Sequence, residues 1–394
     1  MEHVRNINTE YNMLKIMTFF RYFGDCLFYG FLFLFLESRI VEPDKISMIA
    51  MITPFVALIS NPLWSHLSKN ANHNRIIMMI LTVLEGISIL VFTQVTLFEA
   101  IAVMTALTAL VGSPFYSLHD GFIGTFAKTY NKDYTKIRFL GTLAYLAGTI
   151  FAGIILYFFP NQYNILLYVG GIIFVLIALF FIFIKPIDLT LTKGGEEVKR
   201  DYKAILKNKA FIVYMISFFL VNTISFTADN YVSLYFQSLD VEPTEWTFIF
   251  ASFLLAEFIT MFILSKKENK ININILWLIA TILYPLRSLI LATDLPLVVK
   301  IIATNLRGIS YGIILVVNVR CISKICGIEN VTASLFLMGI FTAVIQIIAH
   351  FFYGKIITYI GYNYFFLIVG LIGLIGMSIN LIYQIKHKFS YDDK

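Results

Sequence analysis

Long runs of apolar residues, separated by short polar stretches, recur along the whole chain. Each run has about 20 residues, and a helix of that length crosses a hydrocarbon core of about 30 Å. The pattern predicts twelve membrane-spanning helices, at residues 14–36, 46–67, 76–95, 98–122, 139–159, 164–184, 211–236, 246–264, 273–292, 297–319, 331–352 and 364–385. We therefore expect an all-α integral membrane protein.

The longest polar interruption follows the sixth predicted span and covers residues 186–209. It divides the chain into an N-terminal half, residues 1–185, and a C-terminal half, residues 210–394, each with six predicted spans. The interruption is charged and is too short for a soluble catalytic domain. We expect it to be a cytoplasmic linker between two six-helix domains.

Composition supports a membrane protein, because 59% of the residues are hydrophobic and only 14% are charged. The net charge of +6 could instead indicate a nucleic-acid partner. With the N-terminus placed inside, however, most Lys and Arg residues fall in cytoplasmic segments, as the positive-inside rule requires. We expect a multi-pass protein of the cytoplasmic (plasma) membrane, with both termini cytoplasmic, that contacts lipid and no nucleic acid.

Several ionisable residues lie within the predicted spans or close to their ends, where each costs about 2.5–3.5 kcal/mol if it faces lipid near the membrane centre. They are Arg21, Asp25, Glu85, Asp120, Asp229, Glu257, Arg287 and Arg307. Such residues are expected to face a water-filled cavity or one another. The C-terminal half offers two acids and two bases, a balance of signs that favours mutual pairing.

Four of the intramembrane residues have open interpretations. Arg21 and Asp25 are four residues apart on one helix, so they either neutralise each other or take part in function. Glu85 has no partner in its own span and is either a functional acid or bonded to a neighbouring helix. His350 either carries protons, since imidazole titrates near neutral pH, or is simply hydrogen-bonded.

The segment at residues 135–151 brings a cation into the mouth of an apolar run. Drawn as a helix, it places Arg138, Gly141 and Tyr145 on one face with further small residues. One interpretation is a surface anchor, with Arg138 reaching the lipid headgroups and the glycines allowing close helix packing. The other is one wall of a polar cavity that faces a ligand.

These residues together resemble those of the lactose permease group of proton-coupled sugar symporters, within the major facilitator superfamily. In that family an acid in helix 4 precedes the arginine of helix 5 by the interval that separates Asp120 from Arg138, and a tryptophan that stacks on the sugar is matched by Tyr145. The segment LLAEFIT places Glu257 at the position of the family's sugar-binding glutamate. The resemblance implies that these four residues bind substrate.

The same resemblance extends to the family's coupling network in helices 7 to 10. The segments SFTADNYVSLYFQS and LYPLRSLILATD place Asp229 and Arg287 in that network, together with Glu257 and Arg307. The family's helix 10 histidine and proton-releasing glutamate are matched by Arg307 and Ser310. Either the proton is carried elsewhere, by Asp229, Glu257 or Glu85, or transport is uncoupled.

The resemblance implies a secondary transporter with two six-helix halves that takes up a small hydrophilic solute, a sugar or a glycoside, by alternating access with a proton. An exporter of amphipathic compounds is the second interpretation. A polytopic membrane enzyme is a third, but the sequence has no clustered nucleophile, metal-ligand spacing or Gly-rich phosphate loop. We expect a monomeric, non-enzymatic protein without metal or cofactor.

Overall fold

A computed structural model describes residues 6–40, 42–68, 70–188, 202–266, 272–327 and 330–387, and within these ranges it contains helices and no strands. The helices are α1 (Ile7–Tyr29), α2 (Leu32–Arg39), α3 (Pro43–Leu67), α4 (Ala71–Phe92), α5 (Phe98–Gly112), α6 (Phe115–Thr129), α7 (Tyr134–Phe158), α8 (Tyr163–Phe183), α9 (Tyr202–Lys207), α10 (Lys209–Phe218), the π-helical turn η2 (Phe219–Thr223), α11 (Ile224–Asp229), α12 (Val232–Gln237), α13 (Pro243–Lys266), α14 (Ile273–Leu291), α15 (Leu297–Cys326) and α16 (Val331–Lys386). The predicted all-α fold is confirmed.

In the described part of the chain, eleven helical segments are long and apolar enough to cross a membrane. The last of them, Ala333–Lys386, has 54 residues and covers the final predicted span, 364–385, and all but the first two residues of the one before it, 331–352. Gly361 interrupts it with φ 83° and ψ 173°, outside the helical region and accessible mainly to glycine. With this interruption counted as a boundary, the twelve predicted spans are accounted for.

Several helices begin earlier than the hydropathy pattern predicts, because polar side chains cap their first turns. The Asn6 carboxamide oxygen accepts hydrogen bonds from the backbone N–H groups of Asn8 and Thr9, so α1 begins at Ile7 and not at residue 14. Asp133 caps α7 in the same way, at 2.9 Å from the N–H of Thr135. Hydropathy marks the apolar core of each helix, whereas the cap marks its start.

Three predicted spans are divided into shorter helices. The first is split into α1 and α2 near Gly30, and the fourth into α5 and α6 at Ser113 and Pro114. Pro114 has no N–H to continue the hydrogen bonding of α5. The seventh span comprises α10, η2, α11 and α12, with a π-helical turn at Phe219–Thr223. The turn comes shortly before Asp229 in the chain, and turns of this kind are frequent at functional sites.

The described residues form two compact units, one made of residues 6–40 and 52–188 and the other of residues 42–51 and 202–387. The predicted boundary at residues 186–209 stays a prediction, because residues 189–201 lie outside the described part of the chain. In the first unit, α1 packs against α7 and α8, and α4 packs against α8. Its core gathers side chains of α1, α4, α6 and α8 around Phe115 and Phe122.

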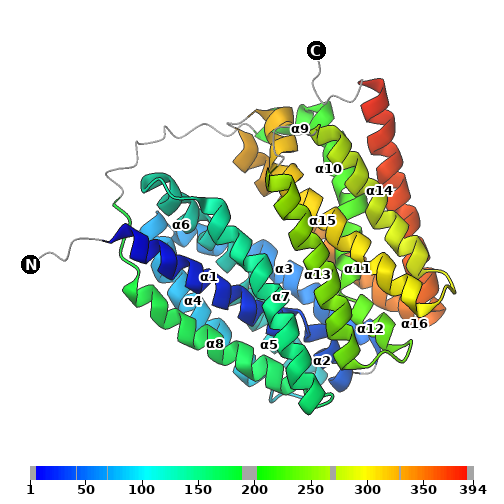
Figure 1. Ribbon diagram of the computed structural model, residues 1–394, viewed down its shortest axis with the longest axis horizontal. Coiled ribbons are helices and arrows are strands. Elements are labelled where there is room, and N and C mark those ends of the chain that lie inside the picture. The colour runs from blue at the N-terminus through cyan, green and yellow to red at the C-terminus, as the bar shows by residue number, and fades with distance from the viewer. Residues whose placement is uncertain are drawn as a thin grey trace, which may run out of the picture. The chain divides into compact units, whose positions relative to one another are not determined.

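In the second unit, α13 runs beside α15, and α14 packs against both α15 and α16 (Figure 1). The first turns of α3 also belong to this unit. There, Tyr231 donates a hydrogen bond of 2.8 Å to the Ser47 hydroxyl, which in turn donates to the backbone carbonyl of His350. A Cβ added at Gly354 would lie 2.4 Å from the Cβ of Ser47, so only glycine permits this approach.

Candidate functional site

A network of two acids and two bases connects four helices of the second unit. Asp229, the last residue of α11, is paired with Arg287 of α14 and lies 3.1 Å from Nε of Arg307 on α15. A terminal nitrogen of the same Arg307 lies 2.6 Å from Oε2 of Glu257 on α13. Tyr284 donates a further hydrogen bond of 3.1 Å to Asp229. The pairing expected from the balance of signs is present, and Arg307 is shared by both acids.

Two glycines bring α15 close enough to α13 for this contact. A Cβ at Gly308 would lie 2.0 Å from the carbonyl oxygen of Phe253, and one at Gly312 would lie 2.9 Å from that of Glu257. The two glycines are four residues apart, the small-residue spacing that allows close packing of membrane helices. The backbone that carries Glu257 is therefore held against α15 next to Arg307.

The surroundings of Arg307 are aromatic as well as acidic. Its guanidinium carbon lies 4.7 Å from the ring centroid of Tyr311 and 5.0 Å from that of Phe253. The side chains of Arg307 and Glu257 are 11% and 7% exposed. Because two acids and two rings surround the Arg307 guanidinium, it can exchange one carboxylate for a polar solute and still have a negative charge beside it.

In the first unit, Asp120 of α6 faces Arg138 of α7. Their nearest atoms, Oδ1 and Nε, are 3.9 Å apart, and the side chains are 42% and 37% exposed. The guanidinium carbon of Arg138 lies 4.9 Å from the ring centroid of Tyr22, and the ring of Tyr22 lies 6.4 Å from that of Tyr145. The fold thus brings together a hydrogen-bond acceptor, a hydrogen-bond donor and two aromatic rings at a place that solvent can reach.

His119 borders this pair but is held by the fold. Its Nε2 lies 3.0 Å from the Thr18 hydroxyl, within hydrogen-bond distance, and its Nδ1 lies 3.8 Å from Asp120. The ring is fully buried and stacks on Phe115 at 5.3 Å. We interpret His119 as a group that positions Asp120.

Arg21, Asp25 and Glu85 also come together, at the centre of the first unit. Arg21 lies 3.3 Å from Asp25 and 2.8 Å from Glu85, and all three side chains are fully buried. The sequence could pair Arg21 with Asp25 from their spacing. It could not identify the partner of Glu85, because that partner lies on α1 whereas Glu85 lies on α4.

His350 and Ser310 have well-defined hydrogen bonds away from the charged residues. His350 lies with Nδ1 2.8 Å from the hydroxyl of Tyr231, and its ring is buried. Ser310, at the position of the family's proton-releasing glutamate, donates a hydrogen bond of 2.9 Å to the carbonyl of Ala280. Ser310 therefore joins α15 to α14 in this protein.

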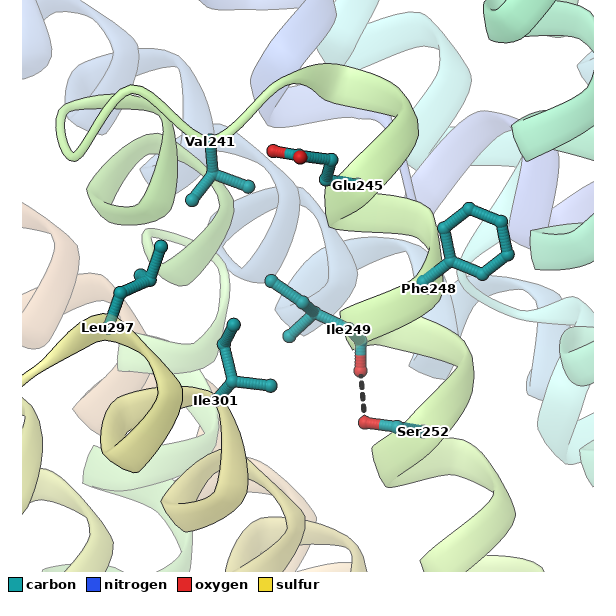
Figure 2. A pocket seen from close by; sticks show the side chains of 7 residues that line it. All are labelled: Val241, Glu245, Phe248, Ile249, Ser252, Leu297 and Ile301. Carbon is teal, nitrogen blue, oxygen red and sulfur yellow. Dashed lines mark hydrogen bonds between the residues drawn. The ribbon is translucent and has the colours of Figure 1, made fainter.

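An apolar cavity of about 360 Å³ lies between α13 and α15 (Figure 2). Its lining comes from the loop before α13 and from both helices, and consists of Val241, Glu245, Phe248, Ile249, Ser252, Leu297 and Ile301. None of the four charged residues of the second-unit network lines it. Phe248 is 73% exposed, as expected for a surface that faces acyl chains. We therefore place the candidate site at the charged residues and not in this cavity.

Within the described ranges, no group of three or more His, Cys, Asp and Glu side chains is arranged so that it could hold a metal ion. The chemistry of the candidate site is that of hydrogen bonding and ion pairing. Carboxylates, guanidinium groups and tyrosines supply both acceptors and donors.

Residues 11–368 match the MFS_1 like family over most of the chain. The chain belongs to this family. A relative in Bacillus subtilis (strain 168), described as "Uncharacterized transporter YwbF", is 22% identical over 236 residues, which are 59% of this chain and 58% of that protein. The matched part thus spans less than two thirds of the relative.

Solved structures share the fold of this family member. The crystal structure of a point mutant of the nucleoside transporter NupG is similar with a TM-score of 0.79 and 15% identity, over 96% of this chain and 99% of that one. A POT family transporter in complex with a thioalcohol-conjugated peptide has a TM-score of 0.74 and 13% identity, over 95% and 96% of the two chains. The family and the fold identify a multi-pass membrane transporter of the major facilitator type. They do not single out the lactose permease group.

Proposed function

We propose that this transporter takes up a small hydroxylated solute, a sugar or a glycoside, across the cytoplasmic membrane together with a proton. The observation that carries the proposal is the half-exposed pair of Asp120 and Arg138 beside the rings of Tyr22 and Tyr145. A carboxylate accepts hydrogen bonds from hydroxyls, a guanidinium donates them, and a tyrosine ring covers the apolar face of a sugar ring.

The name of one structural neighbour agrees with a solute of this kind. NupG is described as a nucleoside transporter, and a nucleoside is a ribose joined to a base, hence a glycoside. At 15% identity this neighbour supports the fold only, so the solute class rests on the side chains. We keep Asp120, Arg138, Tyr145 and Glu257 as the proposed substrate-binding residues.

We assign the second-unit network a coupling role. Arg307 bonds Asp229 and Glu257 at once, whereas Arg287 bonds Asp229. A solute whose hydroxyls donate hydrogen bonds to Glu257 would leave Arg307 to Asp229, so binding would change the pairing within this unit. Exchange of partners of this kind gives the two conformations of a carrier different affinities for the solute, as alternating access requires.

The remaining parts of the proposal concern topology. Most Lys and Arg residues fall in segments that are cytoplasmic when the N-terminus is inside, which supports cytoplasmic termini and a place in the cytoplasmic membrane. Two domains of six spans joined at residues 186–209, in a monomer, complete the proposed architecture.

Uptake into proteoliposomes tests the function, with radiolabelled lactose and uridine as probes. We expect concentrative uptake of one probe under an inward proton gradient, and its collapse when a protonophore is added. Concentrative uptake that persists with the protonophore would rule out proton coupling. Absence of specific uptake and of thermal stabilisation by any sugar or nucleoside would rule out the solute class.

A second experiment tests the role of Glu257. We expect Glu257→Gln to weaken binding of the transported probe about 10- to 100-fold, because a hydrogen bond to a charged group contributes about 1.5–3 kcal/mol. Glu245→Gln is the matched control, since Glu245 is an exposed acid near the start of the same helix. Equal affinity of the two variants would remove Glu257 from the site.

A further inference from the structure

Arg21 lies at the centre of the first unit in a fully buried setting. Its guanidinium carbon lies 4.2 Å from the ring centroid of Phe115 and 3.9 Å from that of Phe174, so the planar group is sandwiched between two rings. A guanidinium held in this way cannot be deprotonated and remains a fixed positive charge. Any acid beside Arg21 therefore interacts with a permanent positive charge.

Two acids contact this one cation. The same terminal nitrogen of Arg21 lies 2.8 Å from Oε2 of Glu85 and 3.3 Å from Oδ1 of Asp25. Tyr29 donates a hydrogen bond of 2.9 Å to the other oxygen of Glu85. Asp25 has Tyr116 beside it, but its contact with Arg21 is 0.5 Å longer than that of Glu85 (3.3 Å against 2.8 Å). Asp25 is therefore the more weakly held acid of the pair.

The charges of this cluster do not balance. Among the described residues, Arg21 is the only cation in ion-pair contact with Asp25 or Glu85, and neither acid is exposed to solvent. The second-unit network, by contrast, has two acids and two arginines. A buried carboxylate without a compensating charge takes up a proton in preference to remaining ionised.

The other titratable or charged side chains near the pair do not supply the missing charge. They are Tyr22 and Tyr29 of α1, Tyr116 and His119 of α6, and Arg138 and Tyr145 of α7. Tyrosines are neutral near pH 7, and His119 and Arg138 both lie beside Asp120, whose carboxylate faces them in place of the Asp25–Glu85 pair. From α8, the contact is the apolar ring of Phe174.

We propose that the Asp25–Glu85 pair binds one exchangeable proton, and that this is the proton that the transporter carries with its solute. The role of this proton in transport rests on the proposed function, whereas proton binding by the Asp25–Glu85 pair does not depend on it. The two carboxyls share the proton as one site, since groups so close titrate as a pair. Release of the proton leaves two acids facing one cation, which favours a rearrangement around Arg21.

A line of contacts joins this proton site to the proposed substrate residues. Arg21 lies 5.9 Å from the ring of Tyr116, the ring of Tyr116 lies 5.9 Å from that of Tyr22, and Tyr22 lies beneath Arg138. A movement of α1 that follows loss of the proton would shift Tyr22 and with it Arg138. This gives solute and proton a physical route to influence each other.

Infrared spectroscopy of the full-length protein in lipid tests the proton site without any solute. At neutral pH, where exposed carboxyls are ionised, we expect the C=O stretch of one protonated carboxyl, which disappears as the pH is raised. Asp25→Asn and Glu85→Gln should each remove this band, because each leaves one acid for one arginine. Glu99→Gln, at an exposed acid of α5, is the matched control and should keep it. A wild-type protein without the band, or a band that survives both amide substitutions, would overturn the proposal.

Transport in proteoliposomes tests the coupling. With the probe that the wild type accumulates, lactose or uridine, we expect Asp25→Asn to lose proton-driven accumulation and to keep exchange of labelled for unlabelled probe. Accumulation equal to wild type would overturn the coupling role. A wild type that transports neither probe contradicts the proposed function instead, and the infrared result still decides whether the pair binds a proton.

Discussion

The contact between α13 and α15 makes Gly308 a position where one methyl group has a calculable effect. In Gly308→Ala the new Cβ would lie 2.0 Å from the carbonyl oxygen of Phe253 and 3.0 Å from the backbone nitrogen of Glu257. Ordinary contacts between such atoms are about 3.5–4.0 Å, so the two helices must separate locally by about 1.5 Å. The neighbouring atoms are backbone, which cannot turn aside as a side chain can.

This separation has two measurable consequences. Overpacking of this kind lowers the free energy of unfolding by about 1–3 kcal/mol. The bond between Arg307 and Glu257, now 2.6 Å, would lengthen beyond the range of a charge-assisted hydrogen bond, about 2.7–2.9 Å. We therefore expect Gly308→Ala to unfold at a lower temperature and to bind the transported solute more weakly.

Gly339→Ala is the matched control, because Gly339 lies in α16 of the same unit and a Cβ there meets no atom within 4 Å. Both substitutions place alanine inside a helix and gain the same intrinsic helix propensity, so the two variants should differ in stability by the overpacking cost alone, about 1–3 kcal/mol. The assay is thermal unfolding of the purified proteins in detergent at one fixed heating rate. Equal unfolding temperatures for the two variants would refute the close packing of α13 on α15.

Three further predictions follow from single contacts. Arg138→Lys should lose most uptake of the transported probe, because a planar guanidinium is replaced by a point charge, and normal uptake would make Arg138 a surface anchor only. Ser310→Ala removes the hydrogen bond to the Ala280 carbonyl and should lower the free energy of unfolding by about 1 kcal/mol, but proton-driven uptake should remain. Loss of proton coupling in this variant would show that Ser310 takes part in the proton step. Gly112→Ala should lower the unfolding temperature, because its Cβ would lie 2.4 Å from Oε1 of Glu85, whereas Gly124→Ala, with no atom within 4 Å, should not.

The sequence predicted the helical fold well, because a hydrocarbon core selects long apolar runs and that selection is local. It also predicted pairing within the set of Asp229, Glu257, Arg287 and Arg307, because a low-dielectric environment requires charges to balance. Helix starts were less accurate, although caps such as Asp133 were visible in the sequence.

Other features could not be predicted because they depend on packing between distant segments. The partner of Glu85 lies on another helix, and nothing in the sequence around Glu85 specifies Arg21. The first turns of α3 pack with α16 only because Gly354 leaves room for Ser47. The π-helical turn before Asp229 likewise has no local signature that hydropathy detects.

The unequal charges around Arg21 also have a consequence for transport across an energised membrane. With its proton bound the cluster is neutral, so the membrane voltage does not act on it, but after the proton is released it carries one negative charge. One charge that crosses the whole field gains or loses about 2.3 kcal/mol per 100 mV. A cytoplasm that is electrically negative would drive the unloaded carrier toward its outward-facing form. Voltage would therefore accelerate the return of the empty carrier and would leave solute binding unchanged.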